Sequence, residues 1–187
     1  SHTTVKMRLL KLLALAALSV GISYGVDIED AALAIEQYKP LAMRGEVIVQ
    51  NGISIIDDTY NASPDSIRSN LRALFSYKGD KRHIAVLGDV LELGEMSGDL
   101  HRSIGAYIES EAAKGRRLDG LYCIGNEAKA IADHVSENTD IPVRICKDNF
   151  ELTSVLKNDL KEGDRVLIKG SRGMHLDDVV GFLKESL

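Results

Sequence analysis

Tryptophan is absent from this sequence, and aromatic residues make up only 5% of the 187 positions. A basic excess is also lacking, because 28 aspartates and glutamates outnumber 23 lysines and arginines and give a net charge of −5. Proteins that bind nucleic acids generally present a basic surface and often stack bases on aromatic rings. We therefore predict no nucleic-acid partner for this chain.

Cysteine is nearly absent as well. Cys123 and Cys146 each lie in a short apolar run typical of a buried strand. A structural zinc site needs several ligands at regular spacing, and the sequence offers no such pattern. Isolated thiols in apolar strands are typical of a reducing compartment. We predict two buried thiols, no metal site and a cytoplasmic location.

The sequence also lacks an apolar run long enough to cross a membrane, which takes about 20 residues. The segment from Met7 to Gly25 resembles a secretory signal, with a basic start and an apolar stretch from Leu12 to Val20. No small-x-small cleavage site follows it, and its leucines and alanines are spaced as on one face of a buried helix. We therefore expect no membrane contact. Secretion stays an open alternative, which the mature N-terminus would decide.

The first forty residues are predicted to form two helices. The first runs from about Thr4 to Gly21, and the second follows Asp27, a favourable N-cap residue. Lys39-Pro40 is expected to end the second helix. Two helices alone cannot bury their apolar faces, so this segment is expected to belong to something larger.

From Glu46 onward, predicted strands alternate with predicted helices. EVIVQ and ISIID flank Asn51-Gly52, which is a strong hairpin signal. The later strands are continuous apolar runs: HIAVLG, GLYCIG, PVRICK and RVLIKG. The first helix of this part is predicted to begin at Pro64, with Ser63 as its cap. Further helices are predicted over Gly98–Ala113, Asn126–Val135, Asn149–Leu160 and Leu176–Leu187. The pattern predicts an α/β fold: a Rossmann-like, mostly parallel sheet with helices on both faces and an N-terminal β-hairpin, preceded by two helices.

The stretch DDTYNAS follows the hairpin at a strand end, where open parallel sheets bind ligands. Asp57 and Asp58 could bind magnesium, act as acid and base, or accept hydrogen bonds from ribose hydroxyls. Asn61 can donate and accept at a base or sugar edge, and Tyr60 offers a ring face for stacking. A helix cap in a solvated turn explains one carboxylate more easily than the whole group.

Two further strand ends carry polar groups. KGSRGMH places Lys169, Ser171 and Arg172 in a glycine-flanked turn that opens a helix, where cations and backbone amides attract anions. A turn with surface cations is the simpler alternative. The loop after Gly88 holds acidic residues including Asp89, and His101 follows in a helix that we expect Ser97 to cap. We expect His101 to be structural rather than catalytic, and its side chain could simply face solvent.

Three long motifs together resemble the Mur ligases, a family of ATP-dependent amide ligases of peptidoglycan synthesis. They are DDTYNASPDSIRSNL, AVLGDVLELGEMSGDLHRSIG and VLIKGSRGMHLDDVV. The resemblance implies that residues 44–187 are the family's C-terminal amino-acid or dipeptide ligase domain, and that residues 1–43 are an incomplete helical tail of its central ATPase domain. No GxxxxGK[ST] phosphate loop occurs in the sequence. The chain is therefore expected to be inactive without the family's other domains.

The resemblance also implies a reaction. In the family, ATP phosphorylates a substrate carboxylate, and an amine then attacks the acyl phosphate. The motifs most resemble the member that joins D-alanyl-D-alanine to UDP-N-acetylmuramoyl-tripeptide. The expected cofactors are ATP and Mg²⁺, bound mainly by the central domain. The expected partners are these two substrates and the chain's own N-terminal and central domains.

Site residues follow from the resemblance position by position. The nucleotide group would be Arg44, Asp58, Tyr60 and Asn61, with Asp58 toward the ribose and Arg44 reaching phosphate. The acceptor-side group would be Lys169, Ser171 and Arg172. No catalytic residue and no metal ligand is assigned within this chain. The sequence has Thr59 and Ser63 where the family commonly has serine and asparagine, and both changes keep hydrogen-bonding capacity.

Besides secretion, two alternatives to the dipeptide-adding ligase remain. One is another amide ligase with the same closing domain, such as a folylpolyglutamate or cyanophycin synthetase, although the YNASP and KGSRGMH loops argue against it. The other is a stand-alone, flavodoxin-like binding domain whose acidic cluster binds magnesium without ATP. A metal titration discriminates between the second alternative and a nucleotide site.

Overall fold

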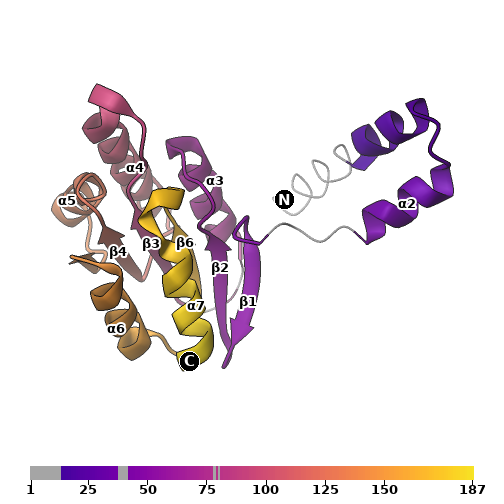
Figure 1. Ribbon diagram of the computed structural model, residues 1–187. Coiled ribbons are helices and arrows are strands. Elements are labelled where there is room, and N and C mark those ends of the chain that lie inside the picture. Colours follow the sequence, from indigo (N-terminus) through magenta and orange to yellow (C-terminus); the bar gives the residue numbers. More distant parts are fainter. Residues whose placement is uncertain (1–13, 38–41, 78, 80) are drawn as a thin grey trace. The chain divides into compact units, whose positions relative to one another are not determined.

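The computed structural model describes residues 14–37, 42–77, 79 and 81–187. The chain divides into two compact units, residues 1–40 and residues 41–187 (Figure 1). In the first unit, residues 14–23 are helical and α2 spans Ile28–Glu36. Asp27 caps α2 as predicted, because its side chain accepts a hydrogen bond from the Glu29 N–H. The predicted helix start at Thr4 and the break at Lys39-Pro40 lie outside the described residues.

The second unit is built on a six-stranded sheet with the order β1-β2-β6-β3-β4-β5. The strands are β1 (Glu46–Gln50), β2 (Ile53–Asp58), β3 (His83–Gly88), β4 (Gly120–Ile124), β5 (Val143–Cys146) and β6 (Arg165–Lys169). β1 and β2 form the antiparallel hairpin, and every other strand pair is parallel. This topology confirms the predicted α/β fold with a mostly parallel sheet.

Helices cover both faces of the sheet (Figure 1). They are α3 (Pro64–Phe75), α4 (Ser97–Ala112), α5 (Lys129–Asn138), α6 (Asn149–Asp159) and α7 (Leu176–Ser186). One apolar cluster packs α3, α4 and α5 against alternate strand residues such as Leu87, and the other packs α6 and α7 against residues such as Val86. Because side chains alternate along a strand, a central strand covered on both faces must be apolar throughout.

Two helix starts differ from the sequence prediction. A short 3-10 helix, η1 (Gly94–Met96), precedes α4, and Ser97 is the first residue of α4 rather than its side-chain cap. α5 begins at Lys129 instead of Asn126, because the N–H groups of the preceding turn are bound from another strand end. Cys123 and Cys146 are buried free thiols, and burial raises the pKa of both.

The strand register brings distant loops to one edge of the sheet. Asp58 at the end of β2 pairs with Lys169 at the end of β6, and Lys169 pairs with Leu87 near the end of β3. The loops that follow these strands therefore meet at the carboxyl edge, where ligands bind in open α/β sheets. Among the helices that the structure describes, none has both the length and the apolar character needed to cross a membrane.

Candidate functional site

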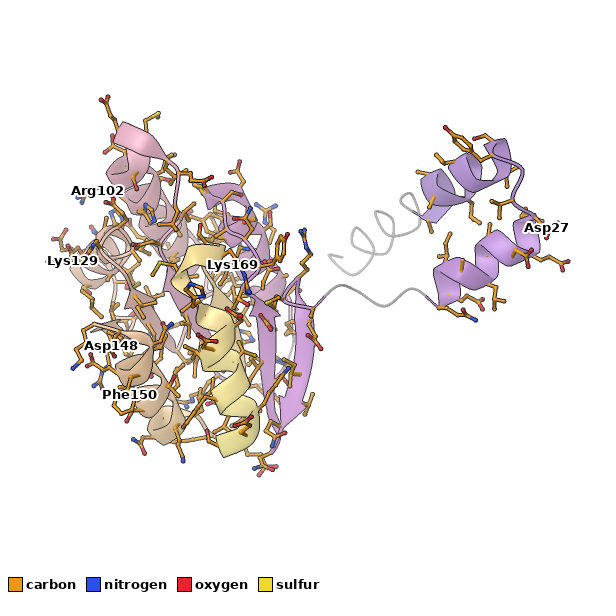
Figure 2. The ribbon with its side chains drawn as sticks, viewed as in Figure 1. Asp27, Arg102, Lys129, Asp148, Phe150 and Lys169 are labelled. Carbon is orange, nitrogen blue, oxygen red and sulfur yellow. The ribbon has the colours of Figure 1, made fainter. Side chains whose placement is uncertain are left out.

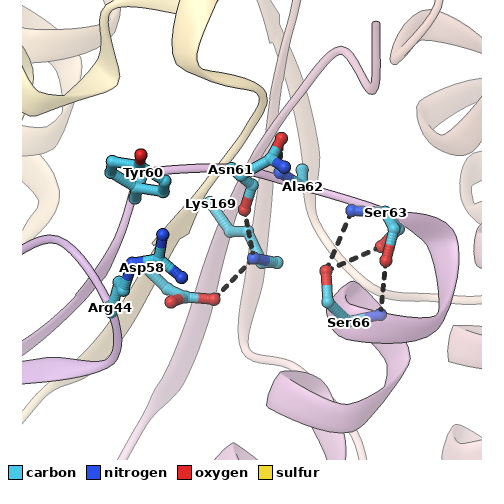
Figure 3. Close-up of a pocket in the computed structure, with 8 residues that line it drawn as sticks. All are labelled: Arg44, Asp58, Tyr60, Asn61, Ala62, Ser63, Ser66 and Lys169. Atoms are coloured by element: carbon cyan, nitrogen blue, oxygen red, sulfur yellow. Dashed lines mark hydrogen bonds and ion pairs between the residues drawn. The ribbon is translucent and has the colours of Figure 1, made fainter. Parts of the chain in front are cut away.

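A pocket of about 270 Å³ lies where β2 and β6 end (Figure 3). It is lined by Arg44, Asp58, Tyr60, Asn61, Ala62, Ser63, Ser66 and Lys169. All four residues predicted to bind nucleotide therefore line one cavity. Of the group predicted for the acceptor side, Lys169 lines the same cavity, whereas Ser171 and Arg172 do not.

The start of α3 lines part of the pocket through Ser63 and Ser66. Ser63 and Ser66 form a reciprocal capping box, in which each side-chain oxygen accepts from the other residue's backbone N–H, at 2.9 and 3.2 Å. Pro64 occupies the first turn, where a missing N–H costs nothing. The local sequence thus fixes where the helix begins, and the helix start carries a partial positive charge next to the pocket.

The neighbouring carboxylates Asp57 and Asp58 point in different directions, because successive strand residues face opposite sides of a sheet. Asp57 is buried and accepts from the N–H and the hydroxyl of Thr59, at 3.2 and 2.7 Å. Burial raises the pKa of Asp57, and the bonds from Thr59 partly oppose that rise. The two acids therefore do not form a paired site. In the described part of the chain, no three His, Cys, Asp or Glu side chains gather to hold a metal ion.

Asp58 is held from two sides. Its Oδ2 accepts from the Lys169 ammonium at 2.5 Å and also from the Asn70 amide. The same ammonium donates to the Asn61 carbonyl at 2.7 Å. Lys169 is only 1% exposed, so this cation is directed at the β2–α3 loop.

Ser171 and Arg172 make structural contacts instead. The Ser171 hydroxyl accepts from the Leu91 N–H at 2.9 Å, which ties the β6–α7 loop to the β3–α4 loop. The Arg172 guanidinium contacts the Asp177 carboxylate at 2.9 Å and the Met43 sulfur at 3.0 Å. Lys169 therefore lines the pocket together with the four residues predicted to bind nucleotide, whereas Ser171 and Arg172 do not line it.

The pocket offers four kinds of contact. The Arg44 guanidinium lies 3.8 Å from the centroid of the Tyr60 ring, which is 43% exposed. Asn61 Oδ1 accepts from the Ala62 N–H. Among the described residues, the Asn61 amide nitrogen and Asp58 Oδ1 have no hydrogen-bond partner. A cation, a ring face, a donor and an acceptor together suit a ligand with phosphate, a base and sugar hydroxyls.

Two polar residues have roles that the sequence did not reveal. Asp89 accepts from three backbone N–H groups, those of Asn126, Glu127 and Ala128, at 3.0, 3.0 and 2.7 Å. His101 was expected to be structural rather than catalytic, and its side chain is fully buried instead of facing solvent. Its Nε2 accepts from the Val90 N–H at 2.9 Å, so Nδ1 carries the proton and donates to the Ser97 carbonyl. Both side chains hold the β3–α4 loop in place.

The chain is similar to known Mur ligases in sequence. Residues 43–172 match the family model described as "Mur ligase, glutamate ligase domain". A UDP-N-acetylmuramoyl-tripeptide–D-alanyl-D-alanine ligase of Bacillus subtilis is 34% identical over 175 residues, which is 92% of this chain and 37% of the relative. The chain thus spans little more than a third of that curated relative.

Solved structures of Mur ligases are also similar to this chain. The MurF ligase of Thermotoga maritima, crystallised in complex with ADP, is 29% identical with a TM-score of 0.69, over 90% of this chain and 36% of that one. A MurF structure from Acinetobacter baumannii is 27% identical with a TM-score of 0.76, over 92% and 37% of the two chains.

Proposed function

This chain belongs to the Mur ligase family, and from that premise we propose that residues 44–187 are the C-terminal domain of an ATP-dependent ligase that joins D-alanyl-D-alanine to UDP-N-acetylmuramoyl-tripeptide. The names of the relatives support this choice of member over a folylpolyglutamate or cyanophycin synthetase. Residues 1–43 are assigned to the tail of the central ATPase domain, which the division of the chain after residue 40 supports. Such a ligase acts in the cytoplasm, where its ATP is.

The proposal for nucleotide binding rests on one observation, the joint lining of the pocket in Figure 3 by Arg44, Asp58, Tyr60 and Asn61. Tyr60 would stack on the base, and Asp58 Oδ1 would accept from a ribose hydroxyl. Arg44 can swing from the Tyr60 ring toward phosphate, since the guanidinium suits phosphate oxygens. ATP supplies the phosphoryl group that activates the substrate carboxylate for attack by the amine.

The remaining parts of the reaction are assigned to the other domains of the ligase. We place the Mg²⁺ ligands, with the phosphate loop, in the central domain, as the resemblance to the Mur ligases implies. Ser171 and Arg172 stay candidates for the acceptor side, where Arg172, with a half-exposed side chain, could reach a carboxylate of the incoming dipeptide. The N-terminal and central domains are the proposed partners of this unit.

A titration of the ¹⁵N-labelled chain with Mg-ADP tests the nucleotide site. We expect shifts at Arg44 and at residues 58–61, with a dissociation constant in the millimolar range, because one domain supplies only part of the contacts. Asp58→Asn should weaken the binding, whereas Lys129→Met, at an exposed position on α5, should not. The absence of shifts at these residues, or the same shifts with MgCl₂ alone, would contradict the proposal, and the second result would favour the magnesium-binding alternative.

A further inference from the structure

Lys169 is a buried cation at the last residue of β6 (Figures 2 and 3). Its side chain is 2% exposed, and a buried ammonium is costly unless it is paired and hydrogen-bonded. Both of its partners, the Asp58 carboxylate and the Asn61 carbonyl, belong to the segment that lines the pocket. The lysine therefore ties the β2–α3 segment to the neighbouring strand.

The bond to Asp58 fixes the orientation of its carboxylate. Oδ2 is occupied by Lys169 and by the Asn70 amide, which leaves Oδ1 as the oxygen available to a ligand. An unrestrained carboxylate could rotate and offer either oxygen to water. A carboxylate locked through one oxygen presents a single acceptor in one direction, and such preorganisation is what makes a hydrogen bond selective.

The second bond acts on Asn61. Because its backbone carbonyl is held by Lys169 and its side-chain oxygen accepts from the Ala62 N–H, the amide nitrogen is presented as a donor. The buried cation thus acts with the Asn70 amide and the Ala62 N–H to set an acceptor and a donor of the pocket. A lysine on the acceptor side would need a free ammonium, and this one is engaged away from Ser171 and Arg172.

We propose that Lys169 is a positioning residue that fixes Asp58 Oδ1 toward the pocket and thereby makes the site select nucleotides that carry ribose hydroxyls. The inference rests on the proposed function, since it assumes that the pocket binds a nucleotide. It replaces the acceptor-side role predicted for Lys169 with one that acts through Asp58. Lys169 itself contacts neither base nor phosphate in this account.

The test compares ADP with 2′,3′-dideoxy-ADP, which lacks both ribose hydroxyls, in NMR titrations of the 187-residue chain. We expect the wild-type chain to bind ADP about tenfold more tightly than the dideoxy analogue, because a charge-assisted hydrogen bond is lost. In Lys169→Met this ratio should fall close to one, mainly through weaker binding of ADP. Lys129→Met makes the same substitution at an exposed lysine and should keep the wild-type ratio.

The ratio of the two affinities separates a positioning role from general destabilisation of the fold. General destabilisation would weaken the binding of ADP and of the dideoxy analogue by the same factor. Because Asp58 is partly exposed, its carboxylate can be hydrated when Lys169 is replaced, and we expect the variant to fold. If its spectrum shows an unfolded chain, Lys169→Gln provides a second variant with the same expected loss. A folded variant that keeps the wild-type ratio overturns the inference alone. A wild-type chain that binds neither nucleotide overturns the proposed nucleotide site, and the inference with it.

Discussion

Replacement of Asp89 by alanine is expected to lower the free energy of unfolding by about 3–5 kcal/mol, as when a buried, hydrogen-bonded charge is removed. The carboxylate is 6% exposed and accepts from three consecutive backbone N–H groups that precede α5. Alanine would leave these donors without a protein partner and would remove the negative charge at the start of the helix. Urea denaturation of the variant and the wild-type chain measures the difference. A loss of this size is a large fraction of the stability of a typical domain.

The matched control is Asp148→Ala at the start of α6. Asp148 is exposed and accepts from one N–H, that of Glu151, at 2.8 Å. An ordinary N-cap of this kind contributes about 1 kcal/mol. Equal losses for the two variants would show that Asp89 is no more than a surface cap.

The backbone at Gly125 packs closely against the Asp89 carboxylate. Its φ is +113°, and a Cβ at this position would lie 2.2 Å from Asp89 Oδ1. The glycine therefore permits both the backbone conformation and the approach of the carboxylate. This packing also explains why α5 begins at Lys129, because residues 126–128 form a turn that donates to Asp89.

The local features of the fold could be predicted from the sequence because local signals determine them. EVIVQ and HIAVLG correspond to β1 and β3 without a shift, since apolar runs bounded by turn residues define short strands. Ser63 and Pro64 fixed the start of α3 in the same way. The position of the pocket also followed, because ligands gather at the carboxyl ends of parallel strands.

The roles of individual polar residues could not be predicted, because their partners are far away in the sequence. Lys169 is 111 residues from Asp58, and only the pairing of β2 with β6 brings them together. The resemblance implied an acceptor-side role for Lys169, and nothing in the local sequence KGSRG shows that its ammonium is paired with Asp58. The burial of His101 depends likewise on the fold of the β3–α4 loop over α4, which no local pattern encodes.

The second large effect concerns the ion pair between Asp58 and Lys169. We expect replacement of its two members to lower the free energy of unfolding by different amounts. We expect Asp58→Ala to cost about 3 kcal/mol, because it leaves a buried ammonium without its counter-ion. Lys169→Met should cost about 1 kcal/mol, since a partly exposed carboxylate can recover hydration from water. The side chains are 2% exposed for Lys169 and 19% for Asp58, which sets this order. Urea denaturation of the two variants and of the wild-type chain measures the two losses of unfolding free energy.

The double variant Asp58→Ala/Lys169→Met provides the control for this asymmetry. Because it removes both charges, it should be more stable than Asp58→Ala alone, and the two single losses should not add. A double variant that is less stable than the wild-type chain by the full sum of the two single losses would contradict the coupling. The expected result would show that the Asp58 carboxylate stabilises the β2–α3 segment as well as facing the pocket. The residues that would select the ligand would then be the same residues that keep the loop folded, and a change that frees Asp58 would affect both.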